Sequence, residues 1–198
     1  MLINNAGRGG TTDFDERNFE TFQTQIQLNV ATTVQLTHLL LPELKRHPKS
    51  YVLNVSSLCI FFFLPRKQVY GGTKSFIYFF SKSLRKELQR QGVIVTVLCP
   101  GGINSNPAQY MLTRSTSALS RLAIMDPEEI APIAVNGLIK GKERIIPGFM
   151  NRFFMCLDLI IPASLKNRLI RNEVNKLNLH EVEMLLRGER PDIGRKIA

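Results

Sequence analysis

The sequence predicts an α/β fold built around a parallel β-sheet, and two kinds of segment that alternate along the chain carry this prediction. Residues 51–55 and 93–99 are short runs rich in β-branched residues, typical of strands buried on both faces of a sheet. Residues 15–46 and 69–91 place apolar side chains near the 3.6-residue spacing of a helix. Strands that alternate with helices favour a sheet with helices on its faces.

The first long helix is expected over residues 15–46. Acidic side chains lie at its start and Lys45 and Arg46 at its end, as the helix dipole favours, and Pro48 stops it. Asn29 interrupts its apolar stripe, and the pattern alone leaves open whether this is a buried amide at a kink. The apolar positions are Phe19, Phe22, Ile26, Val30, Val34, Leu36, Leu39 and Leu40.

The later elements are marked by capping and turn residues. Residues 106–125 form a polar segment with several Ser and Thr, which we interpret as a candidate lid. Asp126 at the N-cap and Pro127 at the first helical position begin a helix that Gly141 ends. Residues 144–147 indicate a last short strand.

Tyr70 and Lys74 are four residues apart, so on a helix their side chains share a face. A free phenol has a pKa near 10, and a nearby ammonium group favours the phenolate and lowers that pKa. Ser57, at the end of a predicted strand, could hold a carbonyl oxygen against the phenol. These groups suffice to protonate a carbonyl oxygen while hydride reaches the carbon. Taken alone, the spacing also fits a tyrosine beside a lysine on a solvated helix.

Five motifs in order resemble those of the short-chain dehydrogenase/reductase family, over residues 1–148. They are Asn4-Asn5-Ala6-Gly7, Leu28-Asn29-Val30, Asn54-Val55-Ser56-Ser57, Pro65 with Tyr70-Gly71-Gly72-Thr73-Lys74, and Pro100-Gly101. The resemblance, strongest to the ketoacyl- and steroid-reducing branch, implies a Rossmann-type doubly wound parallel sheet of order 3-2-1-4-5-6-7. This chain would hold only part of it, namely strands four to seven with their flanking helices.

The resemblance also implies the roles of the site residues. Tyr70 would donate or accept the proton, Lys74 would lower the pKa of Tyr70 and bind the nicotinamide ribose, and Ser57 would orient the carbonyl. Asn29 would support a water relay. The cofactor, NADP in preference to NAD, would contact Asn5, Ala6, Gly7, Tyr70, Lys74, Pro100, Gly101, Ile103 and Ser105, the last in place of the family's threonine.

The family's glycine-rich turn, T-G-x-x-x-G-x-G, has no counterpart in this chain. Gly7, Gly9 and Gly10 follow only a strand stub, which makes them a weak phosphate cradle. At about thirty residues per strand–helix–strand unit, roughly eighty to ninety residues of the domain are expected to be absent. The strand near residue 3 should then form an open sheet edge. Three explanations are open for the expected absence of these residues: the chain is a fragment, a truncated gene product, or the product of a start assigned to an internal methionine.

The formal net charge of +10 is unevenly distributed. Residues 1–64 contain five Lys/Arg and five Asp/Glu, so the whole excess lies after residue 64. This excess of positive charge is consistent with a solvated helix face. It is also consistent with a surface that attracts a phosphate-bearing cofactor, an acyl thioester or an anionic membrane. The sequence contains no basic stripe interleaved with aromatic residues, so it gives no indication of nucleic-acid binding. Three cysteines without C-x-x-C pairing favour a reduced, cytoplasmic location, and the scattered histidines suggest no metal site.

Residues 149–198 are expected to form a helical, basic amphipathic extension to a domain over residues 1–148. The segment over residues 149–161 is too short and too charged to span a bilayer. It could pack over the substrate cleft or a dimer partner, or dock on a membrane surface.

The function expected from these features is that of an NAD(P)-dependent oxidoreductase that interconverts a ketone and a secondary alcohol. The apolar loop over residues 58–64 would either pack in the core or form a wall beside an apolar, lipid-like substrate of 3-oxoacyl or steroid type. The family resemblance implies a homodimer. The alternative is a non-catalytic truncated remnant that acts, if at all, through dimerisation or partner binding.

Overall fold

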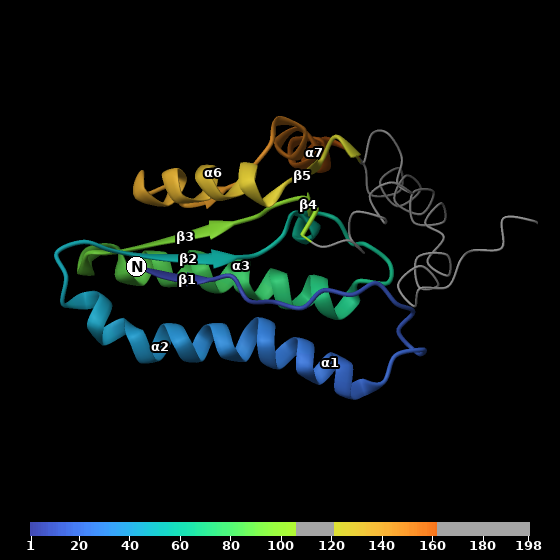
Figure 1. Cartoon of the computed structure of the whole chain (residues 1–198), viewed down its shortest axis with the longest axis horizontal. Coiled ribbons are helices and arrows are strands. Elements are labelled where there is room, and N and C mark those ends of the chain that lie inside the picture. Colours follow the sequence, from blue (N-terminus) through green and yellow to red (C-terminus); the bar gives the residue numbers. More distant parts are fainter. Residues whose placement is uncertain (106–120, 162–198) are drawn as a thin grey trace, which may run out of the picture.

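The computed structural model describes residues 1–105 and 121–161, and these residues are arranged around a four-stranded parallel sheet (Figure 1). Helices cover both of its faces, α2 and α3 on one and α6 on the other. The order of the strands is β1 (Leu2–Asn4), β2 (Ser50–Val55), β3 (Val93–Leu98) and β6 (Arg144–Ile145). The helices are α1 (Phe19–Ile26), α2 (Thr32–Lys45), α3 (Gln68–Leu88), α6 (Pro127–Ile139) and α7 (Phe149–Ile160).

The expected α/β class and parallel sheet are thus confirmed, and β1 lies at an edge of the sheet. The pleat of the strands divides the core between the two faces. Val52 and its neighbour Val95 pack with Leu44 and Leu88 on the α2–α3 side. Leu53, next to Val52, and Leu98, three positions after Val95, point to the other face and pack against α6 with Ile130, Ala134, Leu138 and Ile145. Neighbouring residues of each strand therefore serve opposite layers.

The first helical region differs from the expected single helix over residues 15–46. It begins at Phe19, where the Asn18 side chain accepts a hydrogen bond from the backbone N–H of Glu20 at 3.0 Å. Asp15 therefore precedes the helix. A π-helical turn, η1 (Gln27–Ala31), separates α1 from α2, so one extra residue is accommodated in mid-helix. Asn29 lies in this wide turn.

The end of the described chain follows the expected capping. The Asp126 side chain caps α6, and its backbone N–H donates to Glu129 Oε2 at 3.1 Å, which completes a capping box. Gly141 has a left-handed φ of 69°, which suits the residue that ends a helix. A two-stranded parallel pairing of β4 (Gly102–Ile103) with β5 (Ile124–Met125) had no sequence signal.

A buried ladder of polar side chains ties two helices to the sheet. Asn4 Nδ2 donates to Asn54 Oδ1 at 2.7 Å and to Thr37 Oγ1 at 3.0 Å. Asn54 Nδ2 in turn donates to Ser81 Oγ at 2.9 Å. The ladder therefore runs from α2 through β1 and β2 to α3, and Asn54 is fully buried at its centre.

Helix α7 continues the packed structure beyond residue 148. Its Met155 packs on the cluster formed by Leu58, Val97, Cys99 and Ile146. The rest of the predicted extension, and most of the candidate lid, lie outside the described residues. Within residues 1–105 and 121–161 none of the helices combines the length and apolar character needed to cross a membrane.

The polar ladder predicts a stability effect at Asn54. Asn54→Ala removes the acceptor of Asn4 Nδ2 and the donor to Ser81 in a fully buried place, so it should lower the free energy of unfolding by about 1–3 kcal/mol. Urea denaturation followed by circular dichroism measures this. Gln35→Ala, on the exposed side of α2, is the control and should stay within about 0.5 kcal/mol of wild type. An equally small change for Asn54→Ala would contradict the ladder's role.

Candidate active site

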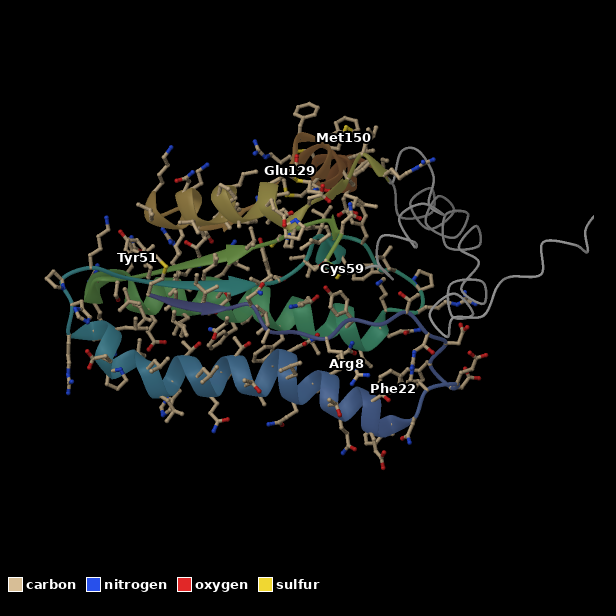
Figure 2. All side chains as sticks on the ribbon, in the orientation of Figure 1. Arg8, Phe22, Tyr51, Cys59, Glu129 and Met150 are labelled. Atoms are coloured by element: carbon tan, nitrogen blue, oxygen red, sulfur yellow. The ribbon has the colours of Figure 1, made fainter. Side chains whose placement is uncertain are left out.

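The candidate residues gather where the parallel strands end. Figure 1 shows the carboxyl ends of β1, β2 and β3, the start of α1 and the start of α3 at the same end of the molecule. In Figure 2, Arg8, Phe22 and Cys59 lie at this end, and Tyr51 lies at the opposite one. Open parallel sheets bind their ligands at the carboxyl ends of the strands. The location therefore suits a binding or catalytic site.

The structure brings Ser57, Tyr70 and Lys74 together from two elements. Ser57 follows β2 and caps the short 3₁₀ helix η2 (Leu58–Phe61), its Oγ accepting from the Cys59 N–H at 3.2 Å. Tyr70 and Lys74 lie in the first turns of α3, and Lys74 Nζ is 5.9 Å from the centre of the Tyr70 ring. Lys74 is only 5% exposed, and its Nζ donates to the Val55 carbonyl at 2.8 Å.

Burial, rather than the lysine, governs the pKa of the phenol. Burial raises the pKa of Tyr70 to about 12, a Cys59 thiolate would raise it further, and a side-chain hydrogen bond with Ser57 acts in the opposite direction. The expected lowering of the Tyr70 pKa by Lys74 is therefore wrong for this structure. The physical reason is that desolvation penalises the phenolate, while Lys74 directs its ammonium group to the Val55 carbonyl. Burial also lowers the pKa of Lys74.

Asn29 clamps the loop that follows β1. Its Oδ1 accepts from the backbone N–H of Arg8 at 2.8 Å, and its Nδ2 donates to the Arg8 carbonyl and to Thr73 Oγ1, each at 3.0 Å. Thr73 Oγ1 donates onward to the Tyr70 carbonyl at 2.8 Å. Asn29 thus connects the β1 loop with the turn of α3 that carries Tyr70, and its water relay stays a prediction.

Thr73, Arg8 and Gln25 are contacts that the sequence did not single out. Gln25, 6% exposed in α1, donates from Nε2 to the Arg8 carbonyl at 3.0 Å. The signal available for Thr73 was its place between Tyr70 and Lys74. Arg8 and Gln25 gave no such signal, because their contact depends on how the β1 loop returns to α1.

The residues expected to contact a cofactor fall in two places. Asn5, Ala6 and Gly7 are exposed directly after β1. A Cβ at Gly7 would come within 3.2 Å of both Asn29 Oδ1 and Lys74 Nζ, so only glycine leaves these two groups undisturbed. Gly7 therefore lies directly against the candidate site.

The second group follows β3. The buried Pro100 accepts the Leu58 N–H at 2.7 Å, so this strand end is joined to the segment after Ser57. A Cβ at Gly101 would overlap the Asn151 side chain and the Ala123 carbonyl, so this glycine permits close packing of the chain itself. Ile103 packs on the α6 side of the core, and Ser105 is exposed.

The apolar loop over residues 58–64 mostly packs inward. Phe61 contacts the Tyr78 ring edge-on with centroids 5.9 Å apart, and Phe62 also joins the cluster around Leu58. Phe63, 90% exposed, is the exception. Of the two interpretations left open for this loop, core packing accounts for its observed contacts.

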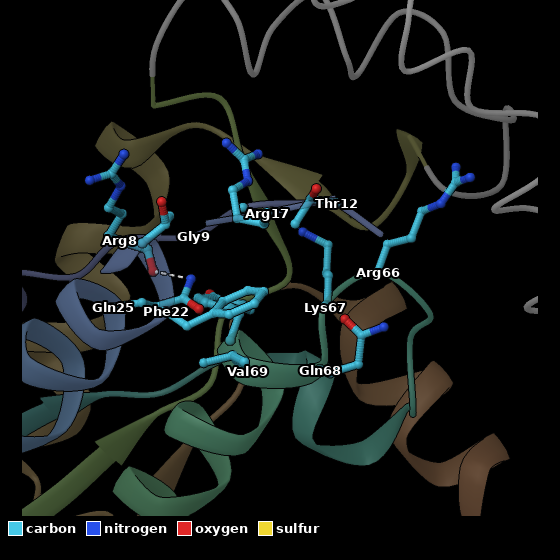
Figure 3. Close-up of a pocket in the computed structure, with 13 residues that line it drawn as sticks. Arg8, Gly9, Thr12, Arg17, Phe22, Gln25, Arg66, Lys67, Gln68 and Val69 are labelled. Carbon is cyan, nitrogen blue, oxygen red and sulfur yellow. Dashed lines mark hydrogen bonds between the residues drawn. The ribbon is translucent and has the colours of Figure 1, made fainter. Parts of the chain in front are cut away.

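An open pocket of about 430 Å³, part of it solvent, lies beside Tyr70 (Figure 3). The β1 loop, the start of α1 and the start of α3 surround it. The residues that line it are Arg8, Gly9, Gly10, Thr12, Arg17, Thr21, Phe22, Gln25, Arg66, Lys67, Gln68, Val69 and Tyr70. Apart from Tyr70, the sequence identified none of them as pocket residues.

The raised pKa predicts an unusual alkaline titration. Subtracting the 295 nm absorbance of Tyr70→Phe from that of wild type should isolate one phenol with a midpoint near pH 12 in the folded protein and near 10 in urea. Since the folded pKa is the higher, the unfolded state loses this proton first. The contribution to stability is complete below pH 10 and disappears as the pH rises to 12. A folded-state midpoint at or below 10 would show that Lys74 outweighs burial.

Comparison with known proteins places this geometry in a family. A family model described as short chain dehydrogenase matches residues 1–115. Serine 3-dehydrogenase from Agrobacterium fabrum is 38% identical over 102 residues, which are 51% of this chain and 41% of that protein. Very-long-chain 3-oxoacyl-CoA reductase-A from Danio rerio is 36% identical over 106 residues, covering 50% and 33%.

Solved structures share the fold. A 3-ketoacyl-(acyl-carrier-protein) reductase from Brucella melitensis complexed with NADH superposes with a TM-score of 0.65 at 22% identity, covering 74% of this chain and 64% of that one. The matches to the two curated relatives span less than half of their length. Because the family model covers more than half of the 198 residues, this chain belongs to the short-chain dehydrogenase family.

Proposed function

We propose that the chain is the catalytic part of an NAD(P)-dependent oxidoreductase that interconverts a ketone and a secondary alcohol. The observation that carries the proposal is the meeting of Ser57, Tyr70 and the buried Lys74 at the carboxyl ends of β1 and β2. A hydroxyl and a phenol that share a hydrogen bond are suited to hold one carbonyl oxygen between them.

In the proposed reaction, the Ser57 hydroxyl donates a hydrogen bond to the carbonyl oxygen and holds it toward the phenol. With a pKa of about 12 the Tyr70 phenol is protonated at neutral pH, so it is ready to donate a proton. The protonated phenol is the form that acts in the reductive direction, in which the carbonyl oxygen gains negative charge. Lys74 would offset part of the cost of burying the phenolate left behind, but not enough to bring the pKa of Tyr70 below that of a free phenol. Asn29 holds the Arg8 loop against this group.

A nicotinamide cofactor would supply the hydride to the carbonyl carbon. The residues after β1 fit such a group, since Asn5, Ala6 and Gly7 are exposed and a Cβ at Gly7 would lie 3.2 Å from Lys74 Nζ. Lys74 would bind its ribose. Pro100, Gly101, Ile103 and Ser105 are proposed to line the other side of the ring. NADP in preference to NAD is proposed from the resemblance to the ketoacyl- and steroid-reducing branch.

The finer features of the function are also proposals. An apolar substrate of 3-oxoacyl or steroid type is proposed, and its 3-oxoacyl form is supported by similarity to the 3-oxoacyl-CoA reductase from Danio rerio. A homodimer through α2 and α3 is supported by exposed apolar side chains on these helices, among them Leu39 at 63% and Phe79 at 73% exposure. Membrane-surface docking is proposed for residues 149–198, of which the structure describes 149–161. A domain boundary at residue 148 is also a proposal. Met155, which follows this boundary, packs on the core of residues 1–148.

The experiment is turnover of a panel of ketones with NADPH and NADH by the 198-residue protein. Tyr70→Phe should lower kcat/KM by about 10²- to 10⁴-fold, because it removes the group proposed to exchange the proton with the carbonyl. Tyr78→Phe is the matched control, since Tyr78 is on the same helix and bonds Arg144 instead. Undiminished turnover by Tyr70→Phe would refute the proposed role of the phenol.

The second candidate is a non-catalytic remnant that acts through its exposed helices, and the exposed apolar side chains of α2 and α3 favour it. Calorimetry with NADPH and NADH discriminates the two. Binding of either nucleotide, weakened by Lys74→Met, supports the oxidoreductase. Absence of binding to a folded chain supports the remnant.

A further inference from the structure

The pocket beside Tyr70 has a charge that neither the fold nor the proposed chemistry requires. Four of its thirteen lining residues are cations, namely Arg8, Arg17, Arg66 and Lys67, and none is acidic. Phe22 and Val69 are its main apolar side chains. A pocket for a purely apolar substrate would be lined predominantly by hydrophobic groups, so this composition indicates another ligand chemistry.

The four cations differ in how far their charge is already neutralised. Arg66 Nε pairs with Asp13 Oδ1 at 2.9 Å. Across residues 1–105 and 121–161, the structure shows no ion pair for Arg8 or Arg17. Lys67 Nζ lies over the Tyr70 ring, 5.5 Å from its centre, and burial lowers the pKa of this lysine. An anion in the pocket would meet at least three cations without a carboxylate partner in the described chain.

The cations are held close to the proposed proton donor. The backbone of Arg8 is bound by the Asn29 and Gln25 side chains, which fixes the base of its side chain relative to α3. Lys67 precedes Tyr70 by three residues and contacts its ring. Figure 3 shows Arg8, Arg17, Thr12 and Lys67 around one opening, above Phe22 and Val69. Tyr70 lines the same pocket as these cations, so a ligand that fills the pocket and touches Tyr70 would also meet them.

We propose that this pocket binds the anionic end, a carboxylate or a phosphate, of the carbonyl substrate whose oxygen faces Tyr70. Arg8, Arg17 and Lys67 recognise the anion, and Thr12 and Gln68 offer hydrogen bonds beside them. The assignment of the carbonyl rests on the proposed function, while the recognition of the anion is a property of the pocket itself. The substrate class narrows accordingly to oxo acids and phosphate-bearing carbonyl compounds.

The test uses 5-oxohexanoate and its methyl ester, which differ in charge, with dissociation constants from ligand-observed NMR titration of the whole chain without cofactor. The acid should bind at least about tenfold more tightly than the ester at low ionic strength, and this preference should shrink with added salt. In the double variant Arg17→Gln/Lys67→Gln the preference should fall to about twofold or less. Equal binding of acid and ester by wild type overturns the proposal.

A matched control separates recognition from overall charge. Lys45→Gln/Lys86→Gln removes the same charge from exposed positions of α2 and α3 and should keep the preference of wild type. An equal loss in this control would mean non-specific attraction by the basic chain and would overturn the proposal. Acetate and inorganic phosphate, used as competitors, distinguish a carboxylate from a phosphate site. If neither acetate nor inorganic phosphate displaces 5-oxohexanoate, the proposal is also overturned.

Two further arms separate this inference from the proposed function. Tyr70→Phe should bind 5-oxohexanoate within about twofold of wild type although it lacks the phenol needed for turnover. Tight binding of the acid by a chain that never turns over ketones would reject the oxidoreductase and leave the anion pocket standing. Competitive displacement of 5-oxohexanoate by NADPH would instead assign the cations to the phosphates of the cofactor, which overturns the substrate assignment.

Discussion

The candidate site depends on one buried cation and the carbonyl that receives it. Lys74 is almost fully enclosed, and its Nζ donates to the Val55 carbonyl where β2 ends. An unpaired ammonium in such a place would be costly, so this hydrogen bond holds α3 in register with the sheet. Because Tyr70 is one turn earlier on the same helix, the bond also sets where the phenol lies relative to Ser57. Gly7 then leaves the space that the ammonium needs.

The same enclosure changes the chemistry that the phenol is suited for. A lysine four residues away suggests a phenol made more acidic, but burial acts on the phenolate more strongly than a cation whose Nζ lies 5.9 Å from the ring centre. The result is a proton donor that stays protonated well above neutral pH. A cation that stabilises the phenolate lowers the pKa of the phenol, so the raised pKa means that burial outweighs any such effect of Lys74. Position and burial together, rather than spacing alone, decide the role of each group.

The parts of the fold that sequence reasoning anticipated are those with a local signal. The β-branched runs before Ser57 and Pro100 and the Asp126–Pro127 cap each carry their own pattern, and the structure contains those elements. The π-helical turn was missed because one inserted residue barely disturbs a helical pattern averaged over many residues. The pairing of β4 with β5 was missed because two-residue strands show no alternation.

The residues of the candidate site likewise fall into those that could be predicted from the sequence and those that could not. Ser57, Tyr70 and Lys74 could be identified because the other family motifs stand around them in order, whereas their spacing alone is ambiguous. Arg66 and Lys67 belong to the basic excess that the sequence shows after residue 64, but their grouping with Arg8 and Arg17 could not be predicted, since 49 to 59 residues separate the two pairs in the chain. Only the folding of the β1 loop onto the start of α3 brings them together. The pKa of Tyr70 was out of reach for a related reason, because the burial that raises it is a property of the assembled fold.

The wide turn at Gln27–Ala31 has a consequence for how this helical region tolerates change in length. A regular helix rotates by about 100° for each residue. The π-helical turn takes up its extra residue by widening, so deleting one position within it would restore a regular helix and leave both flanks in place. Phe22 and Gln25 before the turn, and Thr33, Thr37 and Leu44 after it, would keep the same face toward the interior. A deletion in a regular part of α1 or α2 would instead rotate one half against the other by about that angle, so this helical region tolerates a loss of length best at its widest turn.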